Sequence, residues 1–403
     1  MKKTNAILLI VIIGVVSSLM ADNTNSPPKA VAELPEIKEL ANPFLFADGS
    51  TIRSKEDWQR RRKELKELFE AYEYGHLPAK SEKMIISPGE IIIDQDNEAA
   101  IQNLALNMEH HGKTFTMRVR LTMPRNAEKP SPVVIMSVFG RFENAAGQTG
   151  EARMNRFLGS FIKRGYAVAE FSMQQVAADS KEQPRTTGVY QLFGDNIDCG
   201  GLMAWAWGFH RVIDAIETVD KIDPKKVVVT GHSRYGKAAL LAGAFDERIT
   251  LTVPSHSGCA GAAPYRFIYG KSEQLHNIVG FAPYWFRPDF NRFVDNVERL
   301  PVDQHLLLAL VAPRGLLSAE GTKDAWTNPQ GSQLTYLAAR KVYEFLDAGE
   351  KISIRYRPTG HVPNNEDLLD FADYIFFQKP LPEEFGKLSY PQDKSGFTWD
   401  VPN

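Results

Sequence analysis

Hydrophobic and polar positions follow two different patterns along the chain, and the change falls near residue 130. Over residues 88 to 123, three short stretches mix apolar and polar side chains: GEIIIDQD, IQNLALNME and TFTMRVRLTMP. Stretches of this length and composition, with a turn between the last two, predict antiparallel strands. The segment His110-His111-Gly112-Lys113 predicts the turn between the last two strands, and a turn is the simpler interpretation of its two histidines than a metal site.

After residue 130 predicted strands alternate with helical segments, and the first of these strands, PVVIMSVF, is a continuous apolar run. Strands are expected at 132–139, 166–172, 226–230, 249–255, 314–320 and 351–358, and helices at 153–164, 201–220, 234–245, 303–311, 333–346 and 365–377. Strands that are apolar on both faces and alternate with helices predict a mostly parallel sheet covered on both sides.

Two other segments interrupt this pattern. A helix is expected at about 55–73, and its charged run from Arg60 to Lys63 predicts a solvated face. Residues 174–200 form a long irregular stretch rich in proline and glycine. Long loops without secondary structure are often functional in compact domains.

The first residues have the pattern of a secretory signal. Lys2 and Lys3 precede an apolar run that continues to Val16, and the segment SSLMA follows as far as Ala21. The run is shorter than the roughly 20 residues needed to span a bilayer, so we expect cleavage near Ala21 and no stable membrane insertion. A bacterial periplasmic or extracellular location is expected. The expected organisation is a signal at 1–21, a lead and helix at 22–87, and one catalytic domain at 88–403 with its core at about 130–378.

Composition and charge exclude several classes of protein. The chain has 403 residues, 43% of them apolar, and 47 basic residues balance 49 acidic ones, so nothing in its bulk charge attracts nucleic acid. No phosphate-binding glycine loop, dinucleotide fingerprint or zinc motif is present, and we expect neither a cofactor nor a metal. The two cysteines, Cys199 and Cys259, are too few for a disulfide scaffold; a bond between them and two free buried thiols are equally open.

The segment VVVTGHSRYGK carries the sharpest chemical signal. A buried strand runs into Gly231, His232 and Ser233, and a helix follows, which is typical of the nucleophile elbow of an α/β-hydrolase. The second glycine, Gly236, comes one position later than in the usual G-x-S-x-G pattern. We therefore expect an α/β-hydrolase three-layer sandwich with a mostly parallel central sheet and N-terminal antiparallel strands, with Ser233 as its nucleophile.

A serine nucleophile needs a base and an orienting acid, which this fold places in loops after later strands in the order serine, acid, histidine. Asp324 is the first aspartate after the strand RGLLSAE, and His361 follows the strand KISIRYRP. Glu320, at the end of the first of these strands, is the rival acid. The sequence thus predicts Ser233, Asp324 and His361 as the catalytic set.

Six motifs in order resemble the glucuronoyl esterases of carbohydrate esterase family 15, especially the bacterial members. They are AWAW at 204–207, GHSRYGK at 231–237, SGCAGAA at 257–263, PYWF at 283–286, LPVDQH at 300–305 and DAWTNP at 324–329. The elbow of that family reads G-[CH]-S-R-x-G-K, which matches the late second glycine. The resemblance spans about 130–378, with weaker similarity in YGHLP at 74–78.

The resemblance implies roles for several residues. Arg234 would direct its guanidinium at the oxyanion, Lys237 and Glu273 would hydrogen-bond sugar hydroxyls, and Trp326 would line the uronic acid pocket. Fungal members carry the acid just after the next strand, where this chain has His256 between two serines. Bacterial members often use the later position, which Asp324 occupies. His256 would then contact the catalytic set or the substrate, or only fill the position.

We therefore expect a secreted, monomeric serine esterase that hydrolyses esters of glucuronic or 4-O-methylglucuronic acid, as in links between glucuronoxylan and lignin. One alternative is an acetyl xylan esterase, against which Arg234 and Lys237 argue because an acetyl group needs no sugar-acid recognition. The other is a catalytically silent carbohydrate-binding homologue, against which the intact Ser233, Asp324 and His361 argue.

Overall fold

The computed structural model describes residues 28–138, 158–194 and 197–402. The signal expected at 1–21 lies outside these residues. So do the last position of the strand expected at 132–139 and the first part of the helix expected at 153–164. Within the described ranges, no helix combines the length and the apolar character that crossing a bilayer requires.

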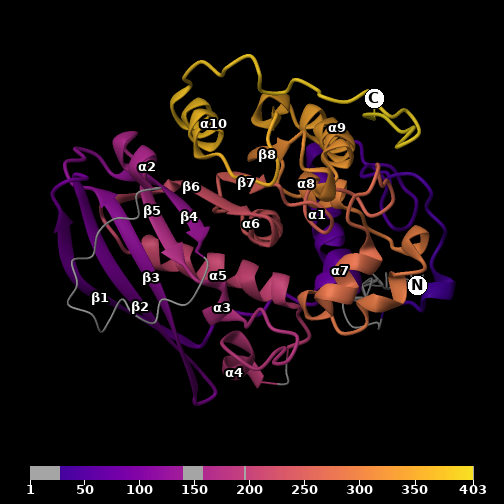
Figure 1. Ribbon diagram of the computed structural model, residues 1–403. Coiled ribbons are helices and arrows are strands. Elements are labelled where there is room, and N and C mark those ends of the chain that lie inside the picture. The colour runs from indigo at the N-terminus through magenta and orange to yellow at the C-terminus, as the bar shows by residue number, and fades with distance from the viewer. Residues whose placement is uncertain (1–27, 139–157, 195–196, 403) are drawn as a thin grey trace, which may run out of the picture.

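One nine-stranded sheet organises the described chain, in the order β1-β2-β3-β5-β4-β6-β7-β8-β9 (Figure 1). The strands are β1 Lys83–Asp94, β2 Ala99–His110, β3 Lys113–Pro124, β4 Ser131–Ser137, β5 Ala167–Phe171, β6 Ile222–His232, β7 Leu251–Ser255, β8 Gly315–Gly321 and β9 Ile352–Arg357. Strands β1 to β3 are antiparallel, and His111 and Gly112, with φ of 46° and 75°, form the turn between β2 and β3. β3 also pairs antiparallel with β5, whereas all neighbours from β5 to β9 are parallel.

Helices cover both faces of this sheet and complete three layers. The α-helices are α1 Lys55–Phe69, α2 Gly159–Lys163, α3 Met173–Val176, α4 Val189–Phe193, α5 Gly201–Ile216, α6 Arg234–Phe245, α7 Leu275–Phe281, α8 Gln304–Ala309, α9 Pro329–Phe345 and α10 Asn365–Phe377. Successive residues of a strand point to opposite faces. Accordingly, Val133 and Ile135 of β4 pack in the apolar cluster that includes α5 and α6, and Val134 packs with α2 and α10. The predicted α/β-hydrolase sandwich is confirmed.

The N-terminal helix differs from its prediction on one face. The Ser54 side chain caps α1 by accepting from the Asp57 amide, but Arg61 and Arg62 are only 6% and 4% exposed. The solvated face predicted for the charged run is wrong for these two residues. Arg62 donates to Glu247 at 2.7 Å and to the Leu310 carbonyl at 3.2 Å, so tertiary packing supplies partners that the sequence pattern does not reveal.

The lead before α1 contributes to the main core. Phe44 and Ile52 are buried in the same apolar cluster as Trp58 of α1 and the apolar residues of α5 and α6. The start of the catalytic domain, expected at residue 88, falls inside β1, which runs from 83 to 94. The lead and the sheet therefore share one core.

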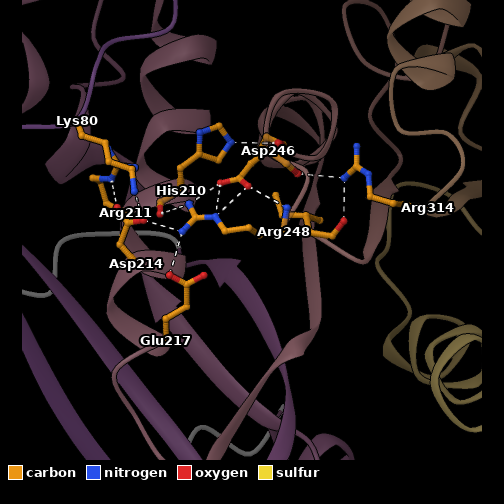
Figure 2. Close-up of polar contacts among 10 residues, drawn as sticks. Lys80, His210, Arg211, Asp214, Glu217, Asp246, Arg248 and Arg314 are labelled. Carbon is orange, nitrogen blue, oxygen red and sulfur yellow. Dashed lines mark hydrogen bonds and ion pairs between the residues drawn. The ribbon is translucent and has the colours of Figure 1, made fainter. Parts of the chain in front are cut away.

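A polar cluster joins the end of α5 to the loop after α6 (Figure 2). Arg248 donates to Asp214 at 2.7 Å, to Glu217 at 3.2 Å and to Asp246 at 2.6 Å. Asp214 also pairs with Arg211 at 2.8 Å. Partly buried, multiply bonded charges of this kind fix the relative position of the segments that carry them. Here these bonds fix the C-terminal end of α6, the helix that begins next to Ser233.

Both cysteines are buried and free. Burial raises the pKa of the Cys199 thiol to about 12. Of the two alternatives that the sequence left open, the structure therefore has two unpaired thiols and no bond between Cys199 and Cys259.

Candidate active site

The turn from β6 into α6 holds Ser233 in a conformation that non-glycine residues rarely adopt. Its φ and ψ are 60° and −127°, and its amide donates to the Ser255 carbonyl at 2.9 Å. A side chain on Gly231 would meet the Tyr235 carbonyl oxygen at 2.2 Å, and one on Gly236 would meet the Gly231 oxygen at 2.8 Å. The two glycines thus face each other across the elbow, and this contact explains why the second one is needed at position 236.

His361 and Asp324 meet although they follow different strands. Asp324 comes three residues after β8, His361 follows β9, and His361 Nδ1 lies 2.6 Å from Asp324 Oδ2. A carboxylate only accepts hydrogen bonds, so Nδ1 carries the proton and Nε2 is the free basic nitrogen. Ser233, Asp324 and His361 line one cavity of about 470 Å³. This arrangement can activate a serine hydroxyl.

His256 contacts the acid directly. Its Nδ1 lies 2.8 Å from the same Oδ2 of Asp324, and its amide donates to the Ala319 carbonyl at 2.8 Å. The side chain is buried, lines the cavity and has a φ of 48°. Of the roles that the sequence left open for His256, the structure supports a contact with the catalytic set.

The two histidines set the charge of the acid. Burial alone would raise the pKa of Asp324, but hydrogen bonds from His256 and His361 hold that pKa well below its usual range. Asp324 is therefore ionised at neutral pH. Burial and the neighbouring His361 lower the pKa of His232 to about 4, so this third histidine, 4.3 Å from His361 between ring centres, is neutral.

The rival acid lies elsewhere. Glu320 is 2% exposed and accepts from the Ser318 hydroxyl at 2.8 Å. Burial raises the pKa of Glu320 to about 7. Among the described residues that line the cavity, Asp324 is the carboxylate bonded to His361, and Glu320 is not part of that lining.

Arg234 begins α6 beside the nucleophile and lines the cavity. Its Nη1 donates to Asp179 Oδ2 at 2.6 Å, and its guanidinium carbon lies 5.4 Å from the ring centre of Trp285. Asp179 belongs to the irregular stretch at 174–200, which the sequence marks as functional only as a whole. No spacing rule singles out this aspartate.

The predicted sugar contacts come together on the cavity wall. Lys237 Nζ donates to the carbonyls of Ser257 at 2.6 Å and Cys259 at 2.5 Å, and it lies 3.5 Å from Glu273 Oε2. The Glu273 amide donates to the Trp326 carbonyl at 2.9 Å, and the Trp326 residue is 53% exposed. Asn277 and Phe281 of α7 also line the cavity, and the sequence carried no signal for them.

Two groups of possible metal ligands occur in the described chain. One is His256, Asp324 and His361, where the short bonds to Asp324 already use its Oδ2. The other is Glu82, His110 and His111 at the turn between β2 and β3, where the Glu82 carboxylate accepts from the His111 amide at 2.9 Å. Hydrogen bonding within the chain accounts for the position of both carboxylates.

Comparison with known proteins agrees with this geometry. The family model described as "Glucuronyl esterase, fungi" matches residues 106–347. The 4-O-methyl-glucuronoyl methylesterase of Podospora anserina is 32% identical over 323 residues, which are 78% of this chain and 62% of that protein. The chain thus spans less than two thirds of that relative's length.

Two solved structures have the same architecture. A family 15 glucuronoyl esterase from Caldicellulosiruptor kristjansonii has a TM-score of 0.77 and 32% identity, with 93% of this chain and 100% of that one covered. A mutant glucuronoyl esterase from Sporotrichum thermophile, solved with methyl 4-O-methyl-β-D-glucopyranuronate, has a TM-score of 0.73 and 25% identity, with 89% and 93% covered. The chain belongs to the glucuronoyl esterases of carbohydrate esterase family 15.

Proposed function

We propose that this protein is a serine esterase that hydrolyses esters of glucuronic or 4-O-methylglucuronic acid, such as those that join glucuronoxylan to lignin alcohols. The proposal rests on one observation: the lining of a single cavity combines two kinds of side chain. Ser233 and His361 supply ester-cleaving groups, while Lys237, Glu273 and Trp326 supply polar and aromatic groups suited to a sugar acid.

In this proposal Ser233 Oγ attacks the ester carbonyl and His361 Nε2 takes its proton. Asp324 holds the opposite ring nitrogen at 2.6 Å and stabilises the imidazolium that forms. The negative oxygen of the tetrahedral intermediate is stabilised by the Arg234 guanidinium and by the backbone N–H of Arg234, the residue after the serine.

The intermediate then collapses. His361 gives its proton to the departing alcohol, and the uronic acid remains bound as an ester of Ser233. Water replaces the alcohol and attacks the acyl carbon while His361 Nε2 takes its proton. The second tetrahedral intermediate then collapses, His361 returns that proton to Ser233 Oγ, and the uronic acid is released. The same pair of groups serves both half-reactions, so no further base is required.

In this scheme Lys237, Glu273 and Trp326 bind the acyl group. Lys237 is fixed by two carbonyl oxygens, and its charge holds Glu273 at 3.5 Å as an acceptor for sugar hydroxyls. The half-exposed indole of Trp326 offers an apolar face to the sugar ring. An acetyl group would leave these groups unused.

We also propose that the protein is secreted, with the segment 1–21 removed, and acts as a monomer on a polysaccharide ester. The N-terminal pattern of Lys2 and Lys3 followed by an apolar run supports secretion. A bacterial periplasmic or extracellular location and a single catalytic domain from about residue 88 remain parts of this proposal.

The test compares turnover of methyl 4-O-methylglucuronate and 4-nitrophenyl acetate by the purified protein. We expect the glucuronate ester to be preferred in kcat/KM, and Ser233→Ala to abolish that activity. Cleavage of the acetate alone would favour the acetyl esterase. A wild-type protein that neither cleaves an ester nor reacts with a fluorophosphonate would instead be a silent carbohydrate-binding homologue.

A further inference from the structure

We propose that Asp179 is a positioning residue that holds the Arg234 guanidinium where the oxyanion forms. The proposal rests on the proposed roles of Ser233 and Arg234. Asp179 lies about 50 residues before the nucleophile in the sequence, in the irregular segment between α3 and α4. Neither the elbow motif nor the serine, acid, histidine order assigns it a role.

Three donors from two distant parts of the chain converge on the Asp179 carboxylate. Oδ2 accepts from Arg234 Nη1 at 2.6 Å, while Oδ1 accepts from the Tyr284 hydroxyl at 2.7 Å and from Trp285 Nε1 at 2.9 Å. The Asp179 side chain is 5% exposed. Both oxygens are thus occupied, and the carboxylate cannot rotate without losing a bond in buried surroundings.

Two aromatic rings also contact the Arg234 guanidinium. Its guanidinium carbon lies 5.4 Å from the ring centre of Trp285 and 5.8 Å from that of Phe281, distances at which a cation is attracted to an aromatic face. Trp285 therefore contacts both members of the pair, through its indole nitrogen and through its ring. The bond to Asp179 uses Nη1, so the other guanidinium nitrogens are available to the cavity that Arg234 lines.

Anchoring matters because an arginine side chain is long and flexible. The Arg234 side chain is 34% exposed, so water would compete for its position if nothing held it. A donor stabilises developing charge best when it is already oriented, since no reorganisation is then needed as the charge forms. Asp179 supplies that orientation, and the two aromatic rings keep the guanidinium in place.

The alternative is a structural role, in which Asp179 only ties the 174–188 segment to Tyr284 and Trp285. Both roles predict a less stable protein when Asp179 is changed. They differ in whether the loss of activity depends on Arg234. A double-mutant cycle separates them, because a residue that acts only through Arg234 has nothing left to contribute once that side chain is removed.

The test measures kcat and KM for methyl 4-O-methylglucuronate in Asp179→Asn, Arg234→Ala and the double variant. We expect Asp179→Asn to lower kcat by about 10- to 100-fold with less than about 3-fold change in KM, which is less than the roughly 100- to 1000-fold loss when an oxyanion donor itself is removed, because Arg234 is still present. The double variant should be no slower than Arg234→Ala alone. Asp179→Glu, which keeps the charge, should recover part of kcat.

Asp214→Asn is the matched control. Asp214 also has a largely inaccessible side chain, 9% exposed, and is bonded to an arginine, Arg248 at 2.7 Å (Figure 2). It is not among the residues that line the cavity. We expect it to lower the melting temperature while leaving kcat unchanged. An unchanged kcat in Asp179→Asn, or an equal fold loss with and without Arg234, would overturn the proposal.

Two further measurements keep the proposal open to refutation. If Asp179→Asn does not fold, Tyr284→Phe removes one bond to Oδ1 and should lower kcat by about 2- to 5-fold, an effect absent in the Arg234→Ala background. The rate at which a fluorophosphonate labels Ser233 also depends on oxyanion stabilisation. It should fall in Asp179→Asn whichever ester is the natural substrate, so failure of the positioning role and failure of the proposed substrate are distinguishable.

Discussion

His256 Nδ1 lies 2.8 Å from Asp324 Oδ2, the oxygen that His361 contacts at 2.6 Å. One carboxylate oxygen therefore orients two histidines. Because Asp324 is nearly buried, each bond offsets part of the cost of keeping its charge away from water. His256 thus serves as a second support for the acid whose partner is the proposed base.

Replacing His256 with phenylalanine keeps an aromatic ring and removes the donor. We expect His256→Phe to lower kcat by about 5- to 50-fold, because Asp324 gains freedom to leave the orientation that His361 requires. His210→Phe is the control, since His210 is likewise buried but bonds the Ala242 carbonyl away from the cavity. Equal kcat in both variants would contradict the supporting role of His256.

Substitutions at the two candidate acids distinguish between them. Asp324→Asn should lower kcat by about 10³- to 10⁴-fold, because the amide favours the wrong tautomer of His361. Glu320→Gln should change kcat by less than about 3-fold, since its carboxyl bonds Ser318 and does not line the cavity. The reverse order of effects would make Glu320 the catalytic acid.

Trp326 should act on substrate choice. We expect Trp326→Ala to lower kcat/KM for methyl 4-O-methylglucuronate by about 10-fold, because a sugar ring loses its apolar contact, and to change acetate turnover by less than about 2-fold. Phe377→Ala is the control, as Phe377 is 44% exposed and outside the cavity lining. Equal losses on both esters would indicate that Trp326 supports the fold rather than the acyl group.

Gly231 of the elbow should not tolerate a side chain. An added methyl group at Gly231 would meet the Tyr235 carbonyl oxygen at 2.2 Å, whereas one at Gly280, in α7, meets nothing within 4 Å. We expect Gly231→Ala to cost about 3 kcal/mol or more in free energy of unfolding, and Gly280→Ala to be neutral or stabilising by up to about 1 kcal/mol. Denaturant unfolding of both variants measures the difference.

Glu73 should make stability depend on pH. Burial raises the pKa of Glu73 from 4.5 to about 7, although Tyr265 donates to it at 2.6 Å. The folded protein therefore binds a proton that the unfolded chain has lost between these pH values, so the free energy of unfolding falls as the pH rises through that window. Glu73→Gln cannot ionise. Its stability relative to wild type should improve by about 1–3 kcal/mol between pH 4.5 and pH 8.

Much of the fold could be read from the chain. Mixed apolar and polar strands before residue 130, and strands alternating with helices after it, correspond to the antiparallel strands β1 to β3 and to the parallel part of the sheet. The elbow at Ser233 and the order of Asp324 and His361 were predictable as well, because a parallel sheet brings the loops after its strands to one edge.

Other features depend on contacts between segments far apart in sequence. The burial of Arg61 and Arg62 requires α1 to lie against Glu247 and the Leu310 carbonyl. The Asp179 bond to Arg234 joins residues 55 positions apart through a loop with no periodic pattern. A side chain's partner in such a loop is set by packing of the whole molecule, which local propensity does not encode.

The sequence by itself therefore determined the class of sheet, and it predicted Ser233 as the nucleophile and the loops that carry its partners, because these follow from local periodicity and chain order. Only the tertiary structure decided that His256 shares Asp324 with His361, that Asp179 anchors Arg234, and that the two thiols stay apart. Each of these is a distance between groups from separate elements, and such distances are fixed when the core packs.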